Sequence, residues 1–300
     1  MKILYRILIG LGFIIAVLTV LGRVLPAPKP PAPGKMVTLA SGADINTYEI
    51  GEGPDVVLIH GLPGSAQSWV EVADGLAKQG FHVVRYDRIG YGSSSRRATG
   101  ADYTMQASAR ELDELIQLMG LKHPALVGWS FGGGVVEASQ SARNPNTPFI
   151  VLVAAIGPDM SLEGKSATIS ALDEWMVRLP LLGGILTKAN IHSRFGDTLT
   201  ERWVDLQHTM MLQPGTMKSY RQEIDQLKPD SLTVSDITTP TLIIHGTKDS
   251  IVEYSVGEGL HDRIKGSKLV SLNEVDHMLP VSNPNEVVDA IITFSRAHRD

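Results

Sequence analysis

Short apolar runs that alternate with helical patterns are the feature that most limits how this chain of 300 residues can fold. The helical patterns repeat apolar residues three or four positions apart, as in residues 69–78, 105–119 and 284–296. The runs are brief and continuously apolar, which is typical of strands buried in a parallel sheet. They are residues 56–59, 82–86, 125–127, 149–155, 241–244 and 268–272. This alternation predicts an α/β fold, in which helices cover both faces of a mostly parallel sheet.

Two segments depart from the alternation. Residues 36–40 and 45–50 are β-prone runs separated by a turn, and they predict a hairpin before the first buried strand. Residues 159–233 contain helical patterns without a convincing strand, so we expect a helical cap inserted over the carboxyl ends of the sheet. Its large side chains could line an apolar acyl pocket or form the cap's own core, and both interpretations stay open. These side chains are Trp175, Met176, Trp203, Met210, Met211 and Met217.

The N-terminal segment is unlike the rest of the chain, because residues 7–22 carry no charged side chain. About 20 helical residues, at about 1.5 Å each, span the hydrocarbon core of a bilayer. We expect residues 1–25 to form an uncleaved, single-pass membrane anchor or signal-anchor. A cleaved signal peptide, with Lys2 and Arg6 as its basic region, is the alternative. Basic residues flank the segment almost equally, so the side of the membrane stays open, with a slight preference for the extracytoplasmic side.

A proline-rich linker is expected to follow the anchor. Residues 26–35 contain five prolines, a composition that favours an extended spacer. The α/β core then comprises residues 36–158 and 234–300, on either side of the cap. The net charge of −5 gives no basic surface, so nucleic acid is not an expected partner. The absence of cysteine excludes disulfides, a thiol nucleophile and thiolate metal sites.

Residues 128–132 read Gly-Trp-Ser-Phe-Gly and fit G-x-S-x-G, the pattern of a nucleophilic serine on a sharp turn between a strand and a helix. The residues before the pattern complete a buried strand, and those after it favour a helix. The pattern alone is weak, because glycine and serine are common in ordinary loops. Ser130 becomes a candidate nucleophile if the chain also supplies a base, an acid and an oxyanion hole.

The acid and the base are expected downstream of the serine, in the order acid and then histidine. Asp249 follows the strand at 241–244, and His277 follows the strand at 268–272, so both fall at the edge where Ser130 is expected. Asp276 is a competing acid, although loop neighbours rarely orient each other's rings. We interpret His60 and His245, which end strands and precede glycine, as structural turn residues.

The oxyanion hole is expected to consist of two backbone amides. The amide of Phe131 follows the nucleophile, and the amide of Leu62 belongs to the loop after an earlier strand. In that loop Gly61 permits the turn, while Pro63 has no amide hydrogen and stiffens the chain. An ordinary Gly/Pro turn is the alternative interpretation. A second loop, which begins at Asp87, is interpreted as a tight structural loop beside the site.

Together these motifs resemble the α/β-hydrolase family, in its serine-nucleophile, esterase- or lipase-like branch. The resemblance covers residues 36–300 and rests on the His60-Gly61 loop, the Asp87 loop, Ser130, Asp249 and His277. It implies an eight-stranded, mostly parallel sheet, a helical cap and hydrolysis without a cofactor or metal ion. The loop His60-Gly61-Leu62-Pro63 is similar to that of epoxide hydrolases and haloalkane dehalogenases. Those enzymes use aspartate where this chain has Ser130, which argues against their chemistry.

The sequence therefore predicts a serine hydrolase that cleaves small to medium or lipid-like carboxylic esters through an acyl-enzyme. Its expected partners are that substrate and, through the N-terminal helix, a membrane, and its oligomeric state is open. The alternatives are an aminopeptidase, a perhydrolase similar to the cofactor-free haloperoxidases, or a carbon–carbon bond hydrolase on the same triad. A catalytically idle, membrane-tethered binding module is the alternative outside the enzymes.

Overall fold

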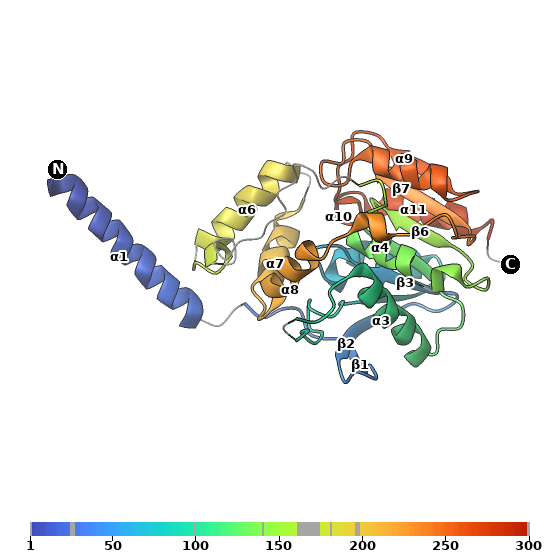
Figure 1. The fold of residues 1–300 in the computed structure, drawn as a ribbon, viewed down its shortest axis with the longest axis horizontal. Helices are drawn as coiled ribbons and strands as arrows, with labels where there is room; N and C mark the ends of the chain where they lie inside the picture. The colour runs from blue at the N-terminus through green and yellow to red at the C-terminus, as the bar shows by residue number, and fades with distance from the viewer. Residues whose placement is uncertain are drawn as a thin grey trace.

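An eight-stranded mixed sheet forms the centre of the computed structural model (Figure 1). The structure describes residues 2–24, 28–98, 100–139, 141–160, 175–180, 182–195 and 199–298. The strands run in the order β1-β2-β4-β3-β5-β6-β7-β8. Their bounds are β1 Lys35–Thr38, β2 Asp44–Ile50, β3 Asp55–Ile59, β4 His82–Tyr86, β5 Ala125–Trp129, β6 Ile150–Val153, β7 Thr241–Gly246 and β8 Lys268–Leu272. The predicted α/β fold with a mostly parallel eight-stranded sheet is confirmed.

Only the first strands run antiparallel to their neighbours. β1 pairs with β2 through Lys35 and Thr47, and β2 pairs with β4 through Thr47 and Tyr86. Every pairing from β4 to β8 is parallel. The carboxyl ends of β3 to β8 therefore meet at one edge, where the loops after them come together.

Helices cover both faces of the sheet because successive strand residues point to opposite sides. Val57 and Ile59 pack with the residues of α3, α4 and α9, whereas Val56 and Leu58 pack with those of α2 and α11. The bounds of these helices are α2 Val70–Lys78, α3 Met105–Leu118, α4 Phe131–Ala138, α9 Tyr254–Arg263 and α11 Pro284–Ser295, and the short α10 spans Leu279–Ser282. The helices expected near 70, 105 and 284 begin within one residue of the expected positions.

Long helices lie between β6 and β7 in the described part of the segment where a helical cap is expected. We call α6 Leu182–Phe195, α7 Glu201–Met211 and α8 Thr216–Asp225 the helical insertion. Residues 161–174, 181 and 196–198 of the expected cap lie outside the described residues. The insertion contacts the loop after β3, where the Gln207 side chain donates to Pro63 O at 2.8 Å. Val204 is fully buried and packs in the same cluster as Trp129 of the core, which favours a packing role for this part of the insertion.

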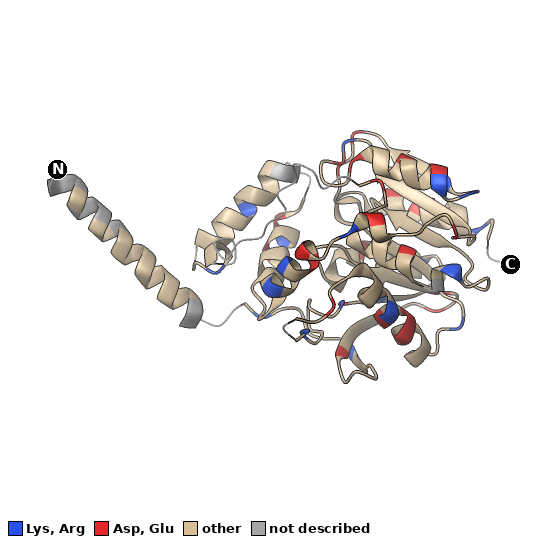
Figure 2. Ribbon diagram, viewed as in Figure 1, with Lys and Arg blue, Asp and Glu red and all other residues tan. Residues whose placement is uncertain are grey.

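The N-terminal segment forms helix α1, Lys2–Val24, which extends away from the sheet (Figure 1). In Figure 2 the ribbon of α1 is tan wherever it is not grey, and the large apolar side chain of Phe13 is 69% exposed. None of the helices in the described ranges combines the length and apolarity that membrane crossing requires. The predicted membrane anchor is therefore not supported. The expected linker is without helix or strand at residues 28–34.

Candidate active site

Ser130 lies on the tight turn between β5 and α4. Its φ of 55° and ψ of −121° are angles that residues with a side chain rarely adopt. Backbone hydrogen bonds hold the turn on both sides, because Ser130 N donates to Val153 O and Ser130 O accepts from Gly133 N, each at 2.9 Å. The rare conformation persists because the surrounding strands determine it, and it lifts the serine out of the sheet.

The two glycines of the pattern are explained by close backbone packing. A Cβ atom on Gly128 would lie 2.3 Å from the carbonyl oxygen of Gly132. A Cβ atom on Gly132 would lie 2.2 Å from the carbonyl oxygen of Ile59, at the end of β3. The obstructing atoms belong to the backbone and cannot move aside as a flexible side chain would. The glycines of the motif therefore allow the turn at Ser130 to pack directly against the end of β3.

Substitution of Gly132 by alanine is expected to lower the free energy of unfolding by about 3 kcal/mol, because the new methyl group would force β3 and the turn at Ser130 apart. Gly12 is a matched control, because it is also helical and a Cβ atom there has no neighbour within 4 Å. Gly12→Ala should leave the stability unchanged or raise it by up to about 1 kcal/mol. Denaturant unfolding of both variants measures the difference, and equal stabilities would contradict this explanation of the motif.

Two hydrogen bonds connect Ser130, His277 and Asp249. The Oγ atom of Ser130 lies 3.0 Å from Nε2 of His277, and Nδ1 of His277 lies 2.8 Å from Oδ2 of Asp249. The three residues follow β5, β8 and β7 in turn, and each is at most 7% exposed. The structure thus brings together the nucleophile, base and acid that were expected from the sequence. A carboxylate in this position fixes the ring so that Nε2 faces the serine hydroxyl.

Asp249 is held on both of its oxygens. Its Oδ1 atom accepts hydrogen bonds from the amides of Ile251 and Val252 at 2.9 and 2.8 Å, while Oδ2 faces the histidines. Burial alone would raise the pKa of Asp249, but the neighbouring His277 and His245 outweigh burial and hold the pKa well below its usual range. The group is therefore a carboxylate at neutral pH, which is the form that can accept from the imidazole.

His245 contributes to the site in a way that sequence reasoning missed. Its Nε2 atom lies 3.3 Å from Oδ2 of Asp249 and 2.9 Å from the carbonyl oxygen of Val252, so Asp249 contacts two histidine rings. The sequence interpretation treated His245 only as a turn residue. The available signal was its position at the end of a strand, four residues before the acid.

Asp276, the competing acid, has a different role in the structure. Its carboxylate accepts from the amide of His277 at 2.6 Å and from the amide and hydroxyl of Ser250 at 3.0 Å. These contacts tie together the loops that follow β7 and β8. Asp276 therefore holds the backbone of His277, while Asp249 holds its ring. The Nε1 atom of Trp129 adds a hydrogen bond to the carbonyl oxygen of His277 at 3.0 Å.

The loop of the candidate oxyanion hole lies directly against Ser130. A Cβ atom on Gly61 would be 2.9 Å from Cβ of Ser130, so the backbone of this loop packs on the serine. Within the described part of the chain, the amides of Leu62 and Phe131 donate to no protein acceptor. Both amides therefore keep their hydrogen-bonding capacity for a ligand oxygen, as the predicted oxyanion hole would require.

The Asp87 loop is a structural neighbour of the site, in agreement with its interpretation from the sequence. The Asp87 carboxylate accepts hydrogen bonds from the amides of Ala66 and Ser93 at 2.8 and 2.9 Å and from the Asn46 side chain at 2.8 Å. The next residue, Arg88, forms a buried ion pair with Glu223 of α8 at 2.8 Å. This pair joins residues that are 135 positions apart, and no sequence pattern indicates it.

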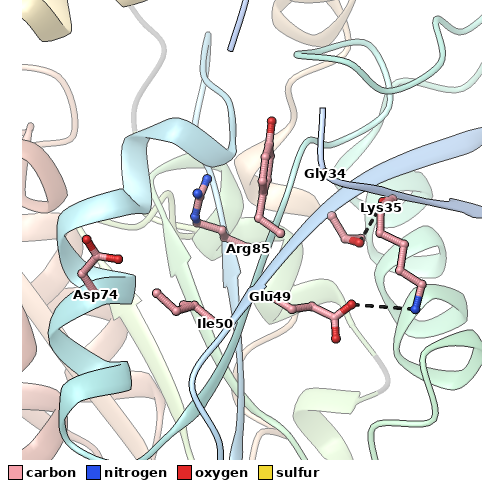
Figure 3. Close-up of a pocket in the computed structure, with 8 residues that line it drawn as sticks. Gly34, Lys35, Glu49, Ile50, Asp74 and Arg85 are labelled. Carbon is pink, nitrogen blue, oxygen red and sulfur yellow. Dashed lines mark hydrogen bonds and ion pairs between the residues drawn. The ribbon is translucent and has the colours of Figure 1, made fainter. Parts of the chain in front are cut away.

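A cavity of about 350 Å³ lies elsewhere, beside β1, β2 and β4 (Figure 3). Its cations already have protein partners: Lys35 pairs with Glu49 at 3.9 Å, and Arg85 stacks 4.3 Å from the ring centre of Tyr48. No triad residue lines it. The described residues also contain no group of three or more histidine, aspartate or glutamate side chains that could hold a metal ion.

Comparison with known proteins identifies related chains. A family model described as the alpha/beta hydrolase fold matches residues 54–284. The chain is 27% identical over 275 residues to a putative non-heme chloroperoxidase of Synechocystis sp., covering 84% of this chain and 94% of the relative. It is 28% identical over 262 residues to Lipase 3 of Moraxella sp., covering 81% of this chain and 78% of the relative. A meta-cleavage product hydrolase from Pseudomonas fluorescens superposes with a TM-score of 0.71 at 24% identity, covering 88% of this chain and 98% of the other. A similarity at this level of identity shows the fold alone.

Proposed function

Because the chain belongs to the α/β-hydrolase fold family, we propose that it is a serine hydrolase of carboxylic esters. The observation that carries the proposal is the hydrogen-bonded series Ser130–His277–Asp249, with distances of 3.0 and 2.8 Å. A serine hydroxyl is a weak nucleophile without such a base. The amides of Leu62 and Phe131, which donate to no acceptor among the described residues, would supply the second requirement, a place where negative charge can develop.

In the proposed reaction, the Oγ atom of Ser130 attacks the acyl carbon while Nε2 of His277 takes the hydroxyl proton. The carbonyl oxygen becomes an oxyanion, which accepts hydrogen bonds from the amides of Leu62 and Phe131. Collapse of the tetrahedral intermediate breaks the ester bond, and the imidazolium gives its proton to the leaving alcohol. Water, deprotonated by the same imidazole, then releases the acid from Ser130. The Asp249 carboxylate stabilises the imidazolium in both steps.

The serine distinguishes this proposal from alternatives that share the fold. Aspartate-based opening of epoxides or displacement of halide needs a carboxylate nucleophile, whereas residue 130 is serine. Relatives named as lipases and as an esterase/perhydrolase support ester chemistry at 24–28% identity. A relative named 2-hydroxy-6-oxo-2,4-heptadienoate hydrolase, at 23% identity, keeps carbon–carbon cleavage as the second candidate.

A substrate panel tests the proposal. The purified chain is assayed with p-nitrophenyl esters from acetate to palmitate, amino-acid p-nitroanilides, a dienoic ketone, and acetate with hydrogen peroxide. We expect ester hydrolysis to dominate, and we expect a fluorophosphonate probe to modify Ser130, located by peptide mass spectrometry. Faster cleavage of the ketone or of the anilides would reject the ester assignment. A chain that neither reacts with the probe nor cleaves any panel member would reject the hydrolase assignment altogether.

A further inference from the structure

The amide of Leu62 and the carbonyl group of Gly61 belong to the same peptide unit. This unit is planar and trans, so its N–H and C=O bonds point in opposite directions. Whatever fixes the direction of the Gly61 carbonyl also fixes the direction of the Leu62 amide. In this loop, therefore, the contacts on the carbonyl side determine whether the amide faces the oxyanion.

Two side chains hold that carbonyl. The Nδ1 atom of His60 lies 2.9 Å from Gly61 O, and Nη2 of Arg88 makes a longer contact to the same oxygen at 3.5 Å. The amide of Arg88 donates to Nε2 of His60 at 3.0 Å, so the ring proton is on Nδ1 and points to the carbonyl. Burial, together with the nearby Arg88 cation, lowers the pKa of His60 well below its ordinary value and keeps this neutral form.

Arg88 is in turn held by the helical insertion. Its Nη1 and Nη2 atoms donate to the two carboxylate oxygens of Glu223 on α8, at 2.8 and 3.2 Å. The Tyr91 hydroxyl donates to the same carboxylate at 2.5 Å. The Arg88 and Glu223 side chains are only 2% and 0% exposed. Burial disfavours the Arg88 cation, but attraction to Glu223 outweighs it and raises the pKa of Arg88 overall.

The geometry of Arg88 suits a bridge between the insertion and the loop. Its planar, forked guanidinium reaches Glu223 on one side and backbone oxygens on the other, where Nε donates to His60 O at 3.2 Å. The ring of Phe131, the residue with the second candidate amide, lies 4.4 Å from the guanidinium carbon. A second contact from the insertion acts on the same loop, since Gln207 of α7 donates to Pro63 O at 2.8 Å.

We propose that Arg88 and Glu223 are positioning residues, through which the helical insertion aims the Leu62 amide at the oxyanion. The proposal rests on the proposed function, because it needs the oxyanion to form beside Ser130. If Glu223 is neutralised, the guanidinium loses the partner that fixes its plane, and its contacts with the carbonyl oxygens of His60 and Gly61 weaken. The His60 ring is then left to hold the Gly61–Leu62 peptide without Arg88, so the peptide is less firmly oriented. The amide then stabilises the transition state less, while binding of the uncharged ester changes little.

The experiment measures kcat and KM for an ester in Glu223→Gln and Arg88→Lys variants of the full chain. Removal of an oxyanion donor lowers kcat by about 100-fold or more, so a misaligned donor should lower kcat by about 10- to 100-fold and alter KM by less than about threefold. Arg88→Lys keeps the positive charge but cannot bridge the carboxylate and the backbone oxygens, so we expect the same loss. In both variants the inhibition constant of a trifluoromethyl ketone, which forms the oxyanion on Ser130, should rise by the factor by which kcat/KM falls.

Two further variants separate positioning from stability. Glu111→Gln breaks the largely buried pair of Arg97 and Glu111, in which Nη2 and Oε2 are 2.6 Å apart, and should lower the melting temperature without altering kcat. Gln207→Met removes the Pro63 contact without unpairing a charge, and should lower kcat by about threefold or more even if Glu223→Gln does not fold. A loss of stability with unchanged kcat and unchanged ketone inhibition would overturn the proposal, as would a rise in KM alone. A wild-type chain that the ketone does not inhibit would reject the proposed function instead.

Discussion

Replacement of Ser130 by alanine is expected to lower kcat for p-nitrophenyl ester hydrolysis by about 10⁴-fold or more. The reason is that the variant lacks Ser130 Oγ, which lies within hydrogen-bond distance of His277 Nε2 and accepts the acyl group in the proposed reaction. The two oxyanion amides and the binding surface remain, so a small residual rate above the uncatalysed reaction should persist. Initial-rate assays on both chains, with the active sites of the wild type titrated by a fluorophosphonate, measure the effect.

Stability provides the control for this substitution. Alanine meets the same backbone restriction as serine at the φ of 55°, and the side chain is only one oxygen smaller. The melting temperature of Ser130→Ala should therefore stay within a few degrees of the wild type, about 3 °C. A variant that is folded and still hydrolyses esters at the wild-type rate would remove Ser130 from the mechanism.

Asp249→Asn is expected to lower kcat by about 10³- to 10⁴-fold with little change in the shape of the site. Two backbone amides donate to Oδ1 of Asp249, so the asparagine oxygen must take that position. Its NH₂ group then replaces Oδ2 and points at Nδ1 of His277, which becomes an acceptor. The ring proton moves to Nε2, and the imidazole can no longer accept the proton of Ser130.

The same substitution should also change the free energy of unfolding by an amount that depends on pH, and the direction of that dependence follows from the lowered pKa of Asp249. Because the pKa of Asp249 lies below its ordinary value of 3.8 in the folded state, the carboxylate stabilises the fold above that value and loses this contribution as the pH falls. The free energy of unfolding of the wild type should therefore exceed that of Asp249→Asn most at neutral pH, and the difference should narrow below about pH 4. Denaturant unfolding across this range checks the sign, and a difference that widens on acidification would contradict it.

The chain order of the motifs was sufficient to predict the sheet and the meeting of Ser130, Asp249 and His277. Parallel strands bring the loops after them to one edge, so short-range patterns determine a long-range arrangement. Contacts between side chains of distant segments follow no such rule. Arg88 meets Glu223 only because α8 packs over the loop after β4, and no periodicity marks either residue as a partner.

Local sequence also could not separate two roles of the same residue. An aspartate just after a strand can be a turn residue or can orient a histidine, and in the structure Asp249 does both, since Oδ1 holds the turn and Oδ2 holds the imidazole. The apolar N-terminal segment was expected to be a membrane anchor. It forms a helix, but composition alone gave no information on the contacts that this helix makes.

Those contacts bear on how the protein is best prepared for study. The Trp175 ring nitrogen donates to the Thr19 hydroxyl of α1 at 3.0 Å, and the Gln213 side chain donates to Pro28 O, also at 3.0 Å. The N-terminal region thus touches the segment between β6 and β7, the same segment from which Gln207 contacts Pro63 and Glu223 holds Arg88. A shortened form that starts at Lys35, a convenient boundary for expression, would lack both contacts. Rate constants obtained with such a truncated form would describe an enzyme whose insertion has lost part of its support.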